Sequence, residues 1–109
     1  MKDTYLIKCD TNGNVSRIKF DKANSYKQLS NAVEGYIECA PAEGLPPMVD
    51  LFVNEEGKLR GLDYNEKLSR VVPCDLIVGN GVFCGHNKMG ESVGLTEEQC
   101  KTIEGLLAD

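Results

Sequence analysis

The sequence predicts an α+β fold with a small, mostly antiparallel sheet, an N-terminal hairpin, a helix after it and a C-terminal helix. Three observations predict this class: an Asn-Gly turn between two β-rich runs, apolar residues at helical spacing directly after them, and a capping box before the last apolar stripe. Strands and helices interleave irregularly, which favours α+β over a doubly wound fold. A chain of 109 residues has the length of one domain, so we expect residues 1–109 to form a single globular unit.

The N-terminal hairpin has the strongest local signal. β-rich runs cover residues 4–9 and 15–20, and the Asn-Gly pair between them tolerates the positive φ angles of a tight turn. Alternation along the second run turns Arg17 and Lys19 away from the predicted apolar face. We therefore expect both cations to point to solvent.

A helix should follow the hairpin. Ser25 stands three residues before Gln28, which is the spacing of a capping box, and apolar residues recur at helical spacing up to Val33. Gly35 supplies the left-handed residue that helix ends prefer. The sequence thus predicts a helix that begins near Ser25 and closes at Gly35.

The rest of the chain predicts short elements and one longer helix. Thr96 and Gln99 form a second capping box, and the apolar stripe after it predicts the C-terminal helix. Residues 75–78 and 82–84 flank a glycine-rich turn and read as two strands or one kinked strand. The remaining predictions are strands over 36–40 and 48–53, a loop over 41–47, a turn over 54–57 and a short helix over 64–70.

Charge and composition exclude several classes of protein. Twelve basic and 17 acidic residues give a net charge of −5, whereas proteins that neutralise phosphates usually carry a basic stripe, so nucleic acid is an unlikely partner. No apolar run approaches the ~20 residues of a membrane span, and we expect no secretory signal, because the first residues lack a long apolar stretch. Five scattered cysteines, an odd number, argue against a disulfide framework. A reducing cytoplasm is the expected location.

Several short strings, taken in order, resemble the family called domain of unknown function 3846. The resemblance covers nearly the whole chain and implies a short cytoplasmic protein of a bacterial phage, plasmid or other mobile element, without assigning any catalytic residue. It is carried by Gly35-Tyr36-Ile37-Glu38, by Asn54-Glu55-Glu56-Gly57-Lys58-Leu59 with Gly61-Leu62 and Asn65, by Asp75-Leu76-Ile77-Val78-Gly79, and by Leu95-Thr96-Glu97-Glu98-Gln99.

Cys84 and His86 are the best candidates for chemistry. Residues i and i+2 of a strand share a side, so a thiolate and an imidazole could approach each other there. The competing interpretation is a structural cysteine beside an exposed histidine that opens a glycine-rich loop, and it is favoured. A structural zinc site needs four ligands, and the Cys-x-x-Cys spacing that builds half of such a site is missing. Cys9, Cys39, Cys74 and Cys84 could converge only through tertiary packing, so we expect no metal and no cofactor.

The central segment offers the best candidate binding surface. Its bases Lys58, Arg60, Lys67 and Arg70 could hold a small anion or an acidic protein patch, but a hairpin turn followed by a solvated helix face is the favoured interpretation. We expect Tyr36 to be a core aromatic whose hydroxyl reaches Glu38 or solvent, whereas a ligand-facing role would require an open sheet face. The predicted binding residues are Tyr36, Asn54, Glu55, Lys58 and Asn65.

The sequence therefore predicts a non-catalytic binding or accessory module that acts on a protein or a small-molecule ligand. The alternative is a thiol-dependent enzyme or redox-responsive protein that uses Cys84 and His86. The oligomeric state stays open, because exposed sheet edges could also pair between copies.

Overall fold

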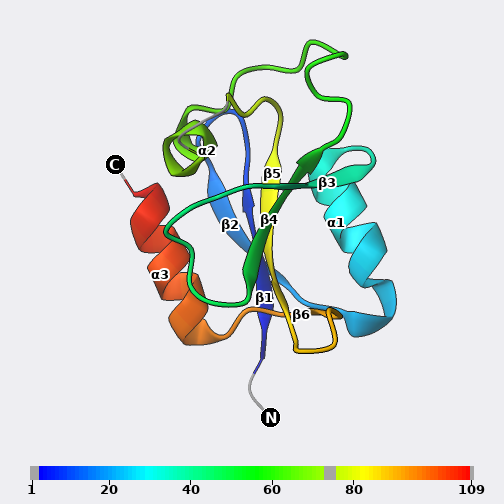
Figure 1. The fold of residues 1–109 in the computed structure, drawn as a ribbon, viewed down its shortest axis with the longest axis vertical. Coiled ribbons are helices and arrows are strands. Elements are labelled where there is room, and N and C mark those ends of the chain that lie inside the picture. The colour runs from blue at the N-terminus through cyan, green and yellow to red at the C-terminus, as the bar shows by residue number, and fades with distance from the viewer. Residues whose placement is uncertain (1–2, 73–75, 109) are drawn as a thin grey trace.

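A computed structural model describes residues 3–72 and 76–108. One sheet lies between α1 on one side and α3 on the other (Figure 1), which confirms the predicted α+β class. The elements in chain order are β1 (Tyr5–Cys9), β2 (Val15–Lys19), a 3₁₀ turn (Lys22–Asn24), α1 (Ser25–Val33), β3 (Ile37–Ala40), β4 (Val49–Asn54), α2 (Glu66–Val71), β5 (Gly81–His86), β6 (Ser92–Val93) and α3 (Glu97–Leu107).

The sheet is antiparallel in every described strand pair. Its order is β2-β1-β5-β4-β3, and β6 pairs with β5 outside this path. The late strand β5 therefore lies in the middle, between the first strand of the chain and β4. Strands β2 and β3 form the two edges of the main path, and the position of β3 matters for the site described below.

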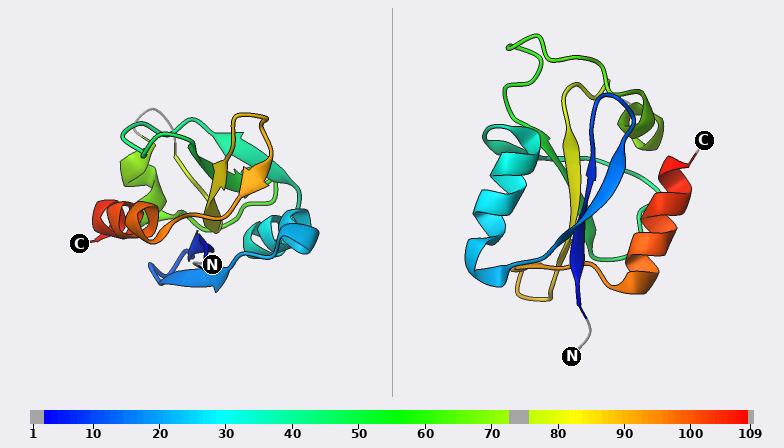
Figure 2. Two further views of the ribbon diagram at one scale, coloured as in Figure 1. Left: turned by 90° about the horizontal axis from the view of Figure 1, so that it is seen from below. Right: turned by 180° about the vertical axis from the view of Figure 1, so that it is seen from behind.

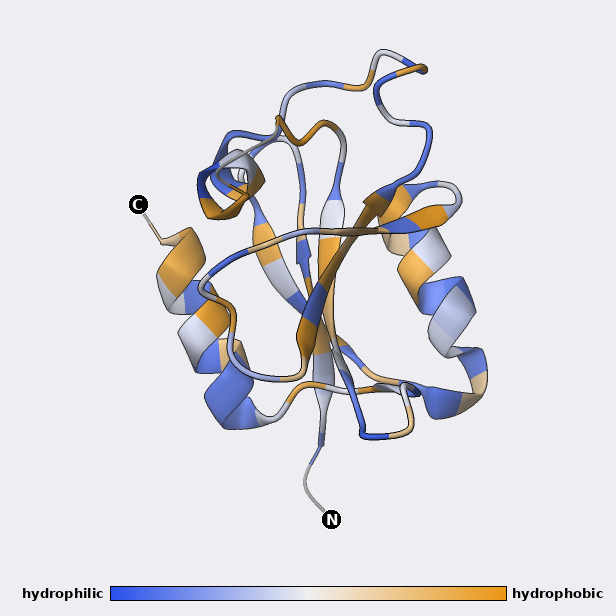
Figure 3. Cartoon of the chain, viewed as in Figure 1, coloured by the Kyte–Doolittle hydropathy of each residue, from blue (hydrophilic) through white to orange (hydrophobic). Residues whose placement is uncertain are grey.

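Helices lie on both faces of the sheet (Figure 2), and apolar residues are frequent along its central strands (Figure 3). Each face carries its own apolar cluster. Leu6, Val82 and Cys84 pack against α1 on one face. On the other face, Ile7, Phe83 and their neighbours on β4 pack against α2 and α3. Because β5 is buried on both faces, its residues form a nearly continuous apolar run. A strand with one face in water would instead alternate apolar and polar residues. The helix residues buried in these clusters are Leu29, Ala32, Val33, Leu68, Val71, Cys100, Ile103 and Leu107.

The hairpin of β1 and β2 forms as predicted, but Arg17 does not point to bulk solvent. The register pairs Arg17 with Ile7, which places the guanidinium on the same face as α3. There it binds Glu97 and Glu104, each at 2.8 Å. The expectation was wrong because it treated the second strand alone, whereas α3 covers that part of the face. Lys19 remains exposed, as expected.

The predicted cap of α1 is also wrong in detail. The 3₁₀ turn already carries the chain into a helical path before Ser25, so Ser25 lies inside the helix rather than at its cap. Gln28 instead accepts a hydrogen bond from the backbone N–H of Asp21 at 2.9 Å. At the other end, the left-handed residue is Glu34, with φ 61°, and not Gly35. Gly35 is needed because the Asn54 side chain packs closely against its backbone: a Cβ there would lie 2.6 Å from Nδ2 of Asn54.

The second half of the chain departs from prediction at β5. This strand continues through Gly85 to His86, so His86 does not open the following loop. Its pairing with β6 was not predicted, because β6 is only two residues long. Asp75 lies outside the described residues, and Val78 forms an isolated bridge with Tyr64 rather than part of a strand. The strand predicted over 75–78 is therefore not found in its described part.

The two later helices agree with their signals. Asn65 caps α2 by accepting from the backbone N–H of Leu68 at 3.1 Å. Thr96 and Gln99 form the predicted capping box of α3, with both reciprocal hydrogen bonds present. Across residues 3–72 and 76–108, no helix combines the length and the apolar composition that crossing a membrane requires.

Candidate functional site

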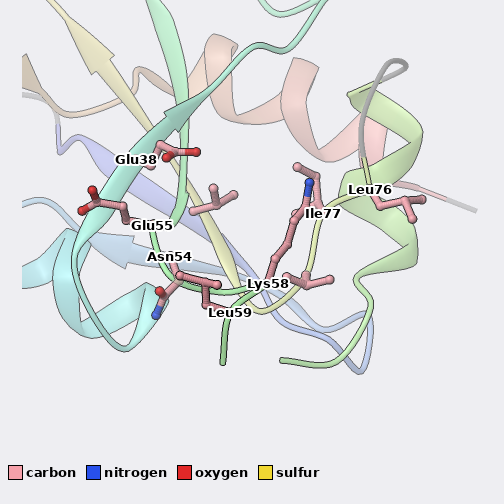
Figure 4. Close-up of a pocket in the computed structure, with 9 residues that line it drawn as sticks. Glu38, Asn54, Glu55, Lys58, Leu59, Leu76 and Ile77 are labelled. Atoms are coloured by element: carbon pink, nitrogen blue, oxygen red, sulfur yellow. The ribbon is translucent and has the colours of Figure 1, made fainter. Parts of the chain in front are cut away.

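A small pocket lies beside the ends of β3 and β4 (Figure 4). It has a volume of about 110 Å³ and is bounded by the end of β4, the turn after it and the segment that leads into β5. Glu38 of the edge strand β3 forms part of its wall. The lining residues are Glu38, Val53, Asn54, Glu55, Lys58, Leu59, Leu76, Ile77 and Val78.

Backbone hydrogen bonds hold the turn after β4 in place. Asn54 is its anchor: its side-chain oxygen accepts from the backbone N–H of Glu56 at 2.8 Å, and its carbonyl accepts from that of Gly57 at 3.1 Å. Gly57 lies tightly against the wall of the pocket, since a Cβ there would lie 3.0 Å from a methyl of Val78. The residues carried by this turn, Glu55 and Lys58 among them, are thus presented from a fixed backbone.

The pocket combines charged walls with an apolar interior. Figure 4 shows Glu38 and Glu55 on one side, with Lys58 extending past Ile77 on the other. Two apolar side chains on its border are strongly exposed: Leu59 at 90% and Leu76 at 62%. Exposed leucines around a depression with both signs of charge are suited to contact a ligand that has an apolar body and a polar end.

Three of the predicted binding residues line this pocket, but they differ in what they offer a ligand. Glu55 and Lys58 are exposed. Asn54 is only 5% exposed, and its amide donates to the carbonyls of Val33 and Glu34 at 3.0 and 3.3 Å. The Asn54 amide therefore ties the end of α1 to the sheet and has no donor directed at the pocket.

Tyr36 and Asn65 lie outside the pocket lining. Tyr36 precedes β3 and is 65% exposed, so the expectation of a core aromatic was wrong: the residue leads into an edge strand and lies largely in solvent. Asn65 is 1% exposed, and its amide donates to the carbonyls of Cys9 and Gly79 at 3.2 and 3.0 Å. Together with its cap of α2, these bonds give Asn65 a structural role.

The structure also separates the four bases that the sequence grouped into one anion surface. Lys58 lines the pocket beside β4, and Arg60 donates to the carbonyl of Glu34 at 3.2 Å. Lys67 and Arg70 border a different depression, next to the β1–β2 turn. No single surface among the described residues gathers all four cations.

Several pocket residues were missed in the sequence. Glu38 had only a weak signal, its alternation with Tyr36 along the strand predicted over 36–40. Leu59 had a clearer one, since it is an apolar residue between two charged residues just after the predicted turn. Leu76 and Ile77 had none, because their place at the pocket depends on the path of a segment that is distant in sequence from β4.

Cys84 and His86 share one face of β5, as predicted, and Asp50 lies on that face too. Asp50 is paired with Cys84 across the strands, and its Oδ2 lies 2.8 Å from Nδ1 of His86. The thiol, however, is completely buried, and its single S–H is shared between the carbonyl oxygens of Val93 and Gly85, which lie 3.2 and 3.3 Å from Sγ. Burial raises the pKa of Cys84 to about 11, so the thiolate needed for nucleophilic attack is scarce near neutral pH.

The other cysteines and acids provide no clear metal centre. Within the described residues, no three His, Cys, Asp or Glu side chains gather as ion ligands would. Cys9, Cys39, Cys84 and Cys100 are free thiols, and only Cys39 of these is exposed. The fifth cysteine, Cys74, lies outside the described residues.

Comparison with known proteins gives one match. Residues 1–108 match the family model described as Domain of unknown function (DUF3846). No curated protein and no solved structure matches the chain. The match spans the sheet and its helices, together with the pocket.

Proposed function

The chain belongs to the DUF3846 family, whose description names no activity, and we propose that it is a binding module that holds its ligand at the pocket beside β3 and β4. The observation that carries this proposal is the pairing of two strongly exposed leucines, Leu59 and Leu76, with charged groups of both signs around one depression. Exposed apolar side chains gathered at a concave site mark interaction surfaces more often than scattered ones do.

The size of the pocket decides what it holds. Small-molecule sites usually enclose about 300–1,000 Å³, whereas this pocket encloses about 110 Å³. The pocket is therefore too small to enclose a whole drug-sized ligand. That space suits one side chain of a protein partner, or the end of a small ligand whose remainder lies on the surface outside.

The charges define the complementary group. The two acids of the lining, Glu38 and Glu55, outnumber its one lysine, Lys58, and attract a cation. The apolar interior formed by Val53, Ile77 and Val78 accepts aliphatic carbons. Long basic side chains meet both demands, because their stems pack on apolar surface and their heads bind carboxylates. Such a side chain on a protein partner is the anchor that we propose.

The setting of this binding role follows from the family resemblance alone. We propose an accessory protein of a phage or other mobile element that acts on a host factor within the cytoplasm. The pocket supports a binding role of this kind, because anchor-sized pockets are typical of protein surfaces that take up a partner's side chain.

A capture experiment with matched variants tests the proposal. The wild-type protein and its Leu59→Asp and Glu38→Lys variants are immobilised, and proteins retained from a bacterial lysate are quantified by mass spectrometry. Glu98→Lys is the control, because it reverses an exposed acid at the start of α3, away from the pocket. A true partner is retained by the wild type and by Glu98→Lys and is lost from both pocket variants. Equal retention of every protein on all four would refute the pocket as the binding site.

A further inference from the structure

The outer edge of β3 is available to another strand. β3 is the last strand of the sheet and pairs only with β4 among the described strands. The backbone N–H of Glu55 donates to the carbonyl of Tyr36 at 2.8 Å, so that pair is hydrogen-bonded across the ladder. Because hydrogen-bonded and non-hydrogen-bonded pairs alternate in an antiparallel ladder, the backbone groups of Ile37 and Cys39 point outward.

The two faces beside this edge differ in chemistry. Glu38 pairs with Val53 and lies on the face that carries the pocket. Ile37 and Cys39 lie on the opposite face, where Ile37 packs against the α1 cluster with Phe52. An added strand would therefore place alternate side chains beside a carboxylate and beside apolar groups.

We propose that β3 binds an extended segment of a partner protein as an added strand, in which basic side chains alternate with apolar ones. This inference rests on the proposed function and specifies how the partner binds. The basic side chains face Glu38 and one of them enters the pocket, while the apolar side chains lie against Ile37 and Cys39. Backbone hydrogen bonds to the outward groups supply affinity, and the two faces supply selectivity.

Charge favours a basic partner over a second copy of this chain. In a two-fold pair of β3 strands centred on Glu38, this carboxylate would face its own copy, and like charges directly opposite each other destabilise a sheet. Glu55 adds a further carboxylate beside the pocket, and the whole chain has a net charge of −5. A basic segment is attracted at long range and pairs locally with the same acids.

Selection from a phage-displayed library of random linear peptides supplies the probe. Peptides that bind the immobilised wild-type protein are sequenced, synthesised and titrated by calorimetry. The proposal expects sequences in which Lys or Arg alternates with apolar residues. Recovery of no binders, or of binders without this alternation, would overturn it.

Substitution at Cys39 tests the edge itself. Proline removes the outward N–H of Cys39 and is tolerated on edge strands whose N–H faces solvent. Cys39→Val keeps the N–H and serves as the matched comparison. Cys39→Pro loses one backbone hydrogen bond to the added strand, and its ring hinders the approach of that strand. Its affinity for the selected peptide should therefore be about tenfold or more weaker than that of Cys39→Val. Equal affinities of these two variants would overturn the added-strand proposal.

A measurement on the wild-type protein covers the case in which Cys39→Pro does not fold. Amide hydrogen exchange at Ile37 and Cys39 should slow when the selected peptide is added, because their N–H groups then enter a ladder. Unchanged exchange at saturation would contradict the proposal, as would a β3-mediated dimer detected by light scattering.

If Cys39→Pro binds normally and Leu59→Asp does not, the pocket proposal stands and the added strand fails. If Leu59→Asp and Glu38→Lys also bind normally, both proposals fail.

Discussion

Arg17 on β2 and Glu104 on α3 form a two-point ion pair, with Nε 2.9 Å from Oε2 and Nη2 2.8 Å from Oε1. Glu97, the first residue of the same helix, accepts two more hydrogen bonds of 2.8 Å from this guanidinium. The planar fork of arginine suits this double recognition, which lysine does not provide. The contact connects the edge strand β2 to a helix that packs on the central strands.

This contact predicts a specific acid sensitivity. Hydrogen bonds from Arg17 lower the pKa of Glu97 and of Glu104 from the ordinary value of 4.5. A lowered pKa in the folded state stabilises the fold above the ordinary value, and that contribution is lost as the pH falls through the folded-state pKa. The urea midpoint should therefore fall between about pH 5 and pH 3, and less steeply in Arg17→Gln than in wild type.

The matched control for this experiment is Lys19→Gln. Lys19 is 75% exposed and lies 3.7 Å from Asp3, so its removal should leave the slope of the urea midpoint against pH as in wild type. An Arg17→Gln protein with the same acid slope as wild type would show that the Arg17 contacts contribute nothing to stability.

Asn65 is predicted to be one of the polar residues whose substitution lowers the stability of the fold most. Asn65→Ala removes the cap of α2 and leaves the carbonyls of Cys9 and Gly79 without their donor inside the protein. A lost cap costs about 1 kcal/mol and each of the two buried unsatisfied carbonyls about 1–3 kcal/mol, so we expect a loss of at least about 3 kcal/mol in the free energy of unfolding. Urea denaturation measures it, with Asn31→Ala, at an exposed position of α1, as the control. A loss below about 1 kcal/mol would contradict the structural role of Asn65.

Two glycine-to-alanine substitutions should change stability in opposite directions. A Cβ at Gly81 would collide with the Leu68 side chain of α2 and lie 3.1 Å from Leu51, so Gly81→Ala should cost about 1–3 kcal/mol. Gly105 lies within α3 with no atom near its Cβ position, and Gly105→Ala should add about 0.5–1 kcal/mol. Thermal unfolding of both variants compares them directly. Equal stabilities would show that α2 does not pack on β5 in this way.

Thiol reactivity distinguishes the binding module from the thiol-dependent alternative. Cys84 is completely buried and its pKa is raised to about 11, whereas Cys39 is exposed. Iodoacetamide followed by peptide mapping should modify Cys39 in the native protein and leave Cys84 unmodified until the protein unfolds. Alkylation of native Cys84 with a titration midpoint below about pH 8 would instead support a reactive cysteine assisted by His86.

How much of the fold could be predicted depended on how local the signal was. The hairpin and the capping box at Thr96 are encoded within a few residues and were confirmed. The position of the Arg17 side chain was predicted wrongly, because it depends on the register with Ile7 and on the packing of α3. The exposure of Tyr36 likewise depends on β3 lying at the edge of the sheet, which no local pattern reveals.

The candidate site was predicted only in part for the same reason. The turn after β4 could be located from its composition, and it carries Glu55 and Lys58 into the pocket. Asn65, in the same polar stretch, turned inward because α2 needs a cap and two buried carbonyls need a donor. The wall formed by Leu76 and Ile77 depends on tertiary packing, which the spacing of residues in the sequence does not show.

Calorimetric titration of the captured partner, or of the selected peptide, tests the binding role of the pocket most directly. Leu59 is 90% exposed, so Leu59→Asp should leave the fold intact while placing a charge where the ligand's apolar part packs. We predict an affinity at least about tenfold weaker than that of wild type, the size of effect expected for an anchor position. An affinity equal to that of wild type would contradict the account.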